Sequence, residues 1–70
     1  METTESVHER KKAVRLRLLR ALADERITPL NVDETTGRGL PSLGRWLSGE
    51  QLPPGTLLGP LERMLDKAER

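Results

Sequence analysis

The side chains of this sequence that could do chemistry are mainly cations, and the chemistry that they offer is the binding of anions. Six positive residues and no negative one lie in the segment from Arg10 to Arg20. The longer segment from Arg10 to Arg45 holds nine cations and four acids, a net charge of +5, although the whole chain carries only +1. Such a local excess suits a polyanionic partner, although a basic run can also be a solvated helix face.

Groups for covalent catalysis or metal binding are scarce. The chain has no cysteine and no tyrosine, and its only histidine is His8, near the chain end. Neighbouring carboxylates such as Asp33 and Glu34 point in different directions on a helix, so they do not form an acid and base pair. We therefore expect no enzyme activity, no metal, no cofactor and no small-molecule substrate.

Length and composition define the domain that must position these cations. The chain has 70 residues, 34% of them hydrophobic, which fits one small domain. Its apolar residues are largely leucine and its only aromatic residue is Trp46, which favours helices over strands. No apolar run approaches the roughly 20 residues of a membrane helix, and the start of the chain lacks a basic signal-peptide region, so we expect a cytoplasmic protein. Because so small a domain gains stability by association, we also expect a homodimer.

The first helix is predicted from a capping signal and from its apolar spacing. Ser6 to Glu9 fit a capping box, which predicts a helix from Val7 to about Arg26, preceded by a flexible acidic arm over residues 1–6. The apolar residues of this helix form two stripes, so we expect two buried faces. The first stripe is Val14, Leu18, Ala21 and Leu22, and the second is Leu16, Leu19 and Ala23.

Three more helices with short connections are expected. Thr28 and the proline after it predict the start of the second helix, which ends at Gly37. The third runs from about Pro41 to Ser48 and has Gly49 after it as the terminating residue. Its inward residues are predicted to be Leu40, Leu43 and Leu47, with Trp46 beside them. The fourth begins at Pro60 and buries leucines that recur at steps of three or four residues.

Two short helices joined by a turn with glycine, after a basic helix and before a packing helix, are typical of a helix-turn-helix domain. Residues 28–65 resemble the lambda-repressor/Cro-like (XRE-type) family. The matching residues are Val32 in the second helix, Gly37 in the turn, Leu43, Arg45, Trp46 and Gly49 in and after the third helix, and Pro53 or Pro54 before the fourth. The resemblance implies a single all-α, lambda-repressor-like four-helix domain over residues 1–70, with residues 28–49 as the helix-turn-helix core.

The resemblance also implies that the third helix enters the major groove of double-stranded DNA. The candidate residues on its groove side or near its start are Leu40, Pro41, Ser42, Gly44, Arg45 and Ser48. Arg45 is the strongest base reader, because a guanidinium can bond O6 and N7 of guanine together; the plainer interpretation is a surface ion pair with Glu50 or Asp33. Phosphate contacts are expected from the turn and from the second and first helices. They involve Arg38, Gly39, Thr28, Lys11, Lys12 and Arg15.

Some residues depart from the family pattern. The position after Val32 is normally alanine, because the two short helices touch there, but this chain has Asp33. Since an unpaired buried carboxylate is costly, either this side chain turns outward or the register differs by one residue. Thr36 and Arg38 also stand where the family usually has apolar residues.

These observations give two hypotheses from different classes. The first is a small sequence-specific DNA-binding regulator, a dimeric repressor of a phage, plasmid or mobile-element promoter. The alternative is a helical protein–protein interaction module, an adaptor or an antitoxin-like partner, that docks through the stripe of Leu16, Leu19 and Ala23. The small number of base readers favours the second, and the central cations favour the first, with an affinity that rests on phosphates and falls with salt.

Overall fold

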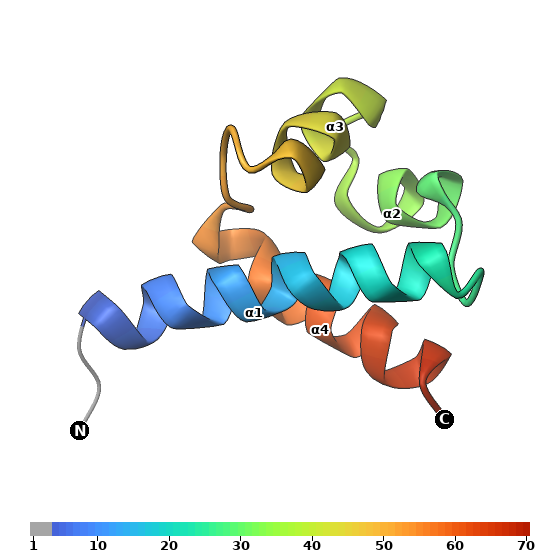
Figure 1. The fold of residues 1–70 in the computed structure, drawn as a ribbon, viewed down its shortest axis with the longest axis horizontal. Coiled ribbons are helices and arrows are strands. Elements are labelled where there is room, and N and C mark those ends of the chain that lie inside the picture. Colours follow the sequence, from blue (N-terminus) through green and yellow to red (C-terminus); the bar gives the residue numbers. More distant parts are fainter. Residues whose placement is uncertain (1–3) are drawn as a thin grey trace.

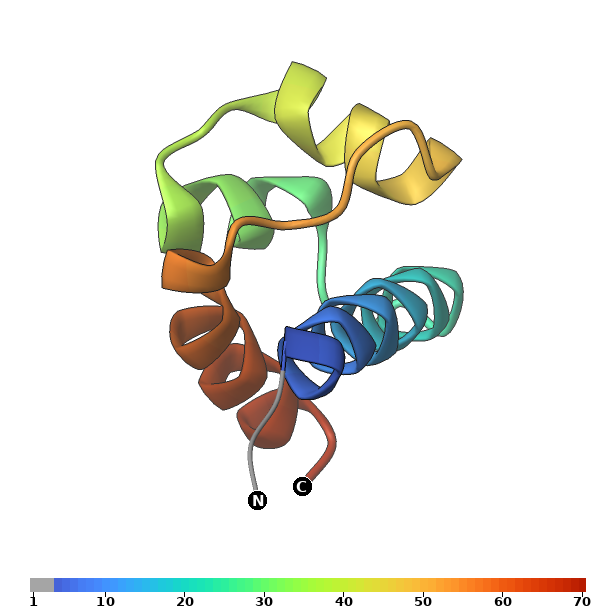
Figure 2. The ribbon, with the colours of Figure 1, turned by 90° about the vertical axis from the view of Figure 1, so that its left-hand side faces the viewer.

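Four helices make up the described part of the chain. The computed structural model describes residues 4–70 and the side chains of residues 7–70. The helices are α1 (Thr4–Ala23), α2 (Pro29–Thr36), α3 (Leu40–Ser48) and α4 (Gly55–Ala68). These residues contain no strand, so the predicted all-α four-helix architecture is confirmed. Figures 1 and 2 show α1 crossing the molecule with α4 packed along it and the pair formed by α2 and α3 above them. In this arrangement α2 packs on α4, and α3 packs on α1.

Helix α1 starts earlier and ends earlier than its sequence predicts. It already includes residues 4–6, so Ser6 lies inside the helix and is not its cap. The rest of the expected acidic arm, residues 1–3, lies outside the described residues. At the other end Glu25 has a φ of 60°, and the amide of Arg26 donates to the carbonyl of Ala21 at 2.9 Å. Because a left-handed residue closes a helix end in this way, α1 stops before Arg26.

The boundaries of α2 and α3 follow the predicted capping signals. The Thr28 hydroxyl accepts a hydrogen bond from the Asn31 amide at 3.1 Å, and the Asn31 side chain accepts one from the Thr28 amide at 2.9 Å. Gly37, at a φ of 67°, ends α2, and Gly49, at a φ of 86°, ends α3. Glycine adopts these left-handed conformations at no steric cost, so both helices end where the sequence predicts.

Helix α4 begins at Gly55, so the prediction that it starts at Pro60 is wrong. Pro60 lies inside the helix, where it cannot donate the usual bond to the carbonyl of Thr56. The turn that precedes it is held by Leu57 and Leu58, which are both buried. Burial of a leucine contributes about 1.5–3 kcal/mol, which offsets the missing hydrogen bond.

All four helices contribute to one aliphatic core. Its buried members are Val14, Leu18, Ala21, Ile27, Val32, Leu43, Trp46, Leu57, Leu58, Leu61 and Leu65. Trp46 is only 3% exposed, so its predicted place in the core is confirmed. Two apolar predictions are wrong. Leu40 is 53% exposed rather than inward, and α1 buries one face rather than two, because Leu16 is 51% exposed.

Candidate nucleic-acid interface

The outer side of α3 is uncovered. Leu43 and Trp46 fix the inner side of this helix in the core. The residues that are exposed on it are Leu40, Pro41, Gly44, Arg45 and Ser48. Helix α3 forms the upper edge of the molecule in Figures 1 and 2, with no other element over it, and its sequence contains no acid. A groove of DNA could therefore approach this side without displacing part of the chain.

Arg45 lies in the last turn of α3 and is accessible. Its Nε atom lies 3.6 Å from Oε2 of Glu50, and the two side chains are 49% and 66% exposed. The ion pair considered from sequence is therefore present with Glu50, but a pair this exposed contributes little, about 0–1 kcal/mol. Its weakness leaves the guanidinium able to exchange Glu50 for another anion.

Gly44 occupies the exposed middle of α3 without a packing reason. A Cβ atom added there would meet no atom within 4 Å, and the backbone does not need a left-handed conformation. Glycine at such a site costs about 1 kcal/mol of helix stability relative to alanine. The interior of the protein thus does not explain the glycine, and a close approach from outside would.

The structure gives Asp33 a role that neither interpretation of the sequence considered. Its side chain is half-buried, and its Oδ1 atom accepts a hydrogen bond of 2.9 Å from the amide of Gly39. Its own carbonyl accepts a bond of 2.7 Å from the amide of Gly37. The carboxylate is therefore not an unpaired buried charge, because it holds Gly39 at the start of α3, while the backbone carbonyl of the same residue holds Gly37.

Two of the predicted phosphate contacts at α2 and the turn are restricted. The amide of Gly39 already donates to Asp33, so a phosphate could bind that amide only by displacing the carboxylate. The amides of Thr28 and Asn31 donate to the capping side chains, which leaves the amide of Leu30 for a phosphate in the first turn of α2. Arg38 is exposed in the turn, where a phosphate contact is sterically open.

The serines of α3 also have partners within the chain. The Ser42 hydroxyl donates to the carbonyl of Arg38 at 3.2 Å. The Ser48 hydroxyl donates to the carbonyl of Arg45 at 3.1 Å and accepts from the amide of Glu50 at 3.3 Å. A contact from either hydroxyl to DNA would compete with these local bonds.

Arg15 has a structural role that the sequence did not predict. Its Nε atom donates to the carbonyl of Trp46 at 2.7 Å, and its second guanidinium nitrogen donates to the carbonyl of Leu47 at 2.9 Å. The last carbonyls of a helix lack partners and form the negative end of the helix dipole, so a cation is favoured there. Arg15 thus ties the end of α3 to α1, and the expected phosphate contact, which stays a prediction, would compete with these bonds.

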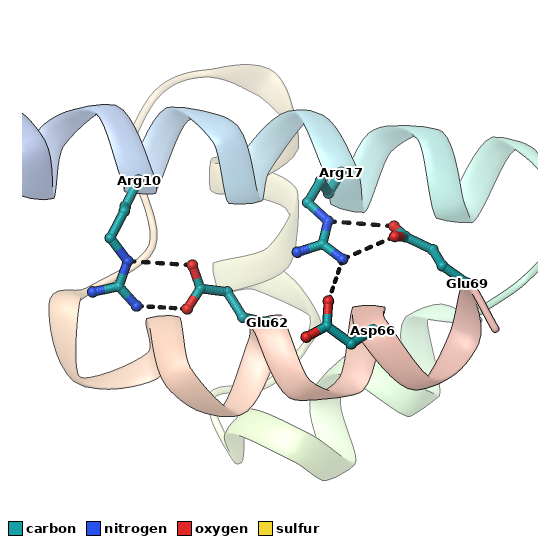
Figure 3. Close-up of polar contacts among 5 residues, drawn as sticks. All are labelled: Arg10, Arg17, Glu62, Asp66 and Glu69. Carbon is teal, nitrogen blue, oxygen red and sulfur yellow. Dashed lines mark hydrogen bonds and ion pairs between the residues drawn. The ribbon is translucent and has the colours of Figure 1, made fainter.

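Two further arginines of the basic run are bound to α4, as Figure 3 shows. Arg10 forms an ion pair with Glu62, and Arg17 contacts Asp66 at 2.7 Å and Glu69 at 2.9 Å. The hydrogen bonds that Arg17 donates to Glu69 and, next in size of effect, to Asp66 raise the pKa of Arg17 above its normal value. The same interval of seven residues separates Arg10 from Arg17 and Glu62 from Glu69, which is the signal that could have predicted this pairing.

The two lysines of α1 remain candidates for phosphate contacts. Lys11 is half-buried, whereas Lys12 is exposed and lies 3.4 Å from Glu9, one turn earlier. Lys12 also borders a shallow groove between α1 and the segment after α3, together with Leu16 and Leu52. Half of the six cations of the basic run, Arg10, Arg15 and Arg17, thus bind α3 or α4, which leaves a smaller positive surface than the sequence suggests.

No protein-family model matches this chain, and no curated protein or solved structure matches it either. The resemblance to the lambda-repressor/Cro-like family therefore stays a prediction. No helix among the described residues is both long enough and apolar enough to span a bilayer. Residues 4–70 also bring no three potential metal ligands together.

Proposed function

We propose that this chain is a small sequence-specific DNA-binding regulator whose helix α3 enters the major groove. The observation that carries the proposal is the outer side of α3, which is exposed and has no acid of its own. Arg45 lies in its last turn, and Gly44 leaves open space beside it. The buried Leu43 and Trp46 support the helix from behind. From the family resemblance, we further propose a repressor of a phage, plasmid or mobile-element promoter.

The proposed mechanism is steric. A homodimer would place two copies of α3 in successive major grooves, about 34 Å apart, on an inverted repeat. Polymerase would then be excluded from the promoter. Asp33 and Arg15 support this mechanism because they fix the two ends of α3, through the turn at Gly39 and through the carbonyls of Trp46 and Leu47.

Affinity in this proposal comes mostly from phosphates. Arg45 is the only cation on α3, and the cations that remain for the backbone are Arg38, Lys11 and Lys12. Three phosphate contacts per protomer make six in the dimer. At about −0.9 per contact, they predict a slope of about −5 for the logarithm of affinity against the logarithm of salt concentration.

The direct experiment is selection of bound sequences from random double-stranded DNA, followed by fluorescence anisotropy on the selected site. We expect an enriched inverted repeat that binds about 1,000-fold more tightly than a scrambled duplex of the same composition. Equal binding to both duplexes would show that α3 does not read bases.

The second candidate function is a helical interaction module, and one observation favours it. Leu16 is 51% exposed and Ala23 is also exposed on the same side of α1, so that side has no partner within the described chain. A heparin column separates the two functions. A DNA binder is retained and elutes with salt, whereas capture of an apolar protein partner changes little with salt.

A further inference from the structure

The first turn of α3 has an apolar outer surface. Leu40 is 53% exposed, and Pro41 beside it is exposed as well. In Figures 1 and 2 this turn lies at the upper edge of the molecule, away from α1 and α4. Leu40 belongs neither to the buried core nor to the partly buried side chains that pack against it. Packing within the described residues therefore does not explain a leucine at this position.

The side chains of this turn offer little hydrogen bonding to a base. Leu40 and Pro41 have no polar side-chain atom. Ser42 is half-buried, and its hydroxyl donates to the carbonyl of Arg38 at 3.2 Å. A base that meets this turn must therefore be recognised through an apolar group. Of the four bases, only thymine presents one in the major groove, its C5-methyl group.

Arg45 lies at a fixed spacing from this apolar turn. Pro41 and Arg45 are four residues apart, so they lie on the same side of α3 and about 6 Å apart along its axis. Gly44, which follows Leu40 at the same interval, has open space beside it and adds no side chain between them. Neighbouring base pairs are stacked about 3.4 Å apart, so the bases that meet the first turn and Arg45 lie within about two base pairs of each other.

We infer that Leu40, with Pro41 beside it, binds the methyl group of a thymine within about two base pairs of the guanine that Arg45 reads. The inference rests on the proposed function, in which α3 enters the major groove with its N-terminal residues at the base edges. It assigns Leu40 as a specificity-determining residue and names two bases of each half-site. Burial of one methyl group against a leucine contributes about three- to fivefold in affinity per half-site.

Replacement of single thymines by 2′-deoxyuridine tests the inference, because uracil is thymine without the C5-methyl group. The duplex is the inverted repeat that the wild type selects, and fluorescence anisotropy measures its affinity after each replacement. We expect one thymine in each half-site whose replacement weakens binding about three- to fivefold, whereas the other thymines change it by less than about 1.5-fold. A selected site without thymine, or similar losses at every thymine, would overturn the inference.

Replacement of single guanines by 7-deazaguanine locates the base that Arg45 reads, because this analogue lacks the N7 acceptor. The replacement should weaken binding of the wild type and leave binding of Arg45→Ala unchanged. The thymine that responds to loss of its methyl group should lie within about two base pairs of this guanine. A responsive thymine farther away would contradict the spacing set by α3.

A double-mutant cycle assigns the methyl contact to Leu40. Leu40→Ala should bind the thymine duplex about threefold more weakly than the wild type, and its loss on the uracil duplex should fall below about 1.5-fold. Leu16→Ala is the matched control, since Leu16 is equally exposed (51% against 53%) but lies on α1, and it should keep the full uracil effect. Circular dichroism melts verify that both variants are folded. An undiminished uracil effect in Leu40→Ala would overturn the assignment.

Failure of the proposed function gives a different result from failure of this inference. Equal binding of the selected and the scrambled duplex by the wild type would overturn both. Sequence-specific binding that does not respond to uracil at any thymine would overturn this inference alone.

Discussion

At the scale of single residues, this chain uses charged side chains to complete backbone hydrogen bonds. Asp33 stands where the resembling family has alanine, and it accepts from the amide of Gly39 at the start of α3. The sequence indicated that Asp33 was unusual but could not identify its partner, because a backbone amide is the same for every residue type except proline. The role of Arg15 could not be predicted either, because its partners are the backbone carbonyls of Trp46 and Leu47, and every residue type has such a carbonyl.

Replacing Asp33 by alanine should destabilise this protein. Asp33→Ala leaves the Gly39 amide without its acceptor, which costs about 1–3 kcal/mol of unfolding free energy. Asp33→Asn keeps an acceptor oxygen and should cost less than about 1 kcal/mol. Urea unfolding followed by circular dichroism measures both values. If the alanine variant were as stable as the wild type, the hydrogen bond would have no role in fixing the turn.

Substitution of Gly44 should change stability and DNA binding in opposite directions. Gly44→Ala should raise the unfolding free energy by about 1 kcal/mol, because it favours the helix and the new methyl group has open space around it. If DNA approaches closely at this point, the same variant should bind the selected site several-fold more weakly. Urea unfolding and anisotropy on one protein preparation give both numbers. A variant that is more stable and binds DNA equally well would show that nothing approaches Gly44.

At the scale of elements, features set by local signals could be predicted from the sequence, and features set by long-range contacts could not. Glycines and a side-chain cap gave the bounds of α2 and the end of α3, since those signals act within one turn. The start of α4 was missed because burial of Leu57 and Leu58 outweighs the local signal of Pro60. The candidate groove side of α3 was predicted from the family resemblance, whereas the partners of the basic run on α3 and α4 could be identified only in the tertiary structure.

Arg15 is the element-scale link between α1 and α3, and its role can be distinguished from a phosphate contact. Arg15→Ala should lower the unfolding free energy by about 1–2 kcal/mol and weaken DNA binding by loosening α3. The salt slope of DNA binding should stay unchanged, because no phosphate contact is lost. Removing a true phosphate contact from each protomer of the dimer would make the slope shallower by about two, which is the result that would contradict this account.

At the scale of the whole molecule, ion pairs between α1 and α4 join the two longest helices. Arg17→Gln should cost about 1 kcal/mol of unfolding free energy, since the network is partly exposed, and Arg63→Gln on α4 serves as the control. Because the pKa of Arg17 is raised, the charged arginine contributes fully below its ordinary pKa and loses its effect only as pH rises through the higher folded value. The difference between the two proteins should therefore not change between about pH 7 and pH 9, and should shrink in 1 M salt. A difference that disappears within this pH range would point to another titrating group.

The central claim, that α3 reads DNA through Arg45, is tested most directly by comparing two arginine variants on the selected site. Arg45→Ala and Arg63→Ala remove the same charge from exposed positions, one on α3 and one on α4. Fluorescence anisotropy at a fixed, moderate salt concentration should show a loss of about 10- to 100-fold for Arg45→Ala and less than about twofold for Arg63→Ala. Equal affinities of the two variants would contradict the account.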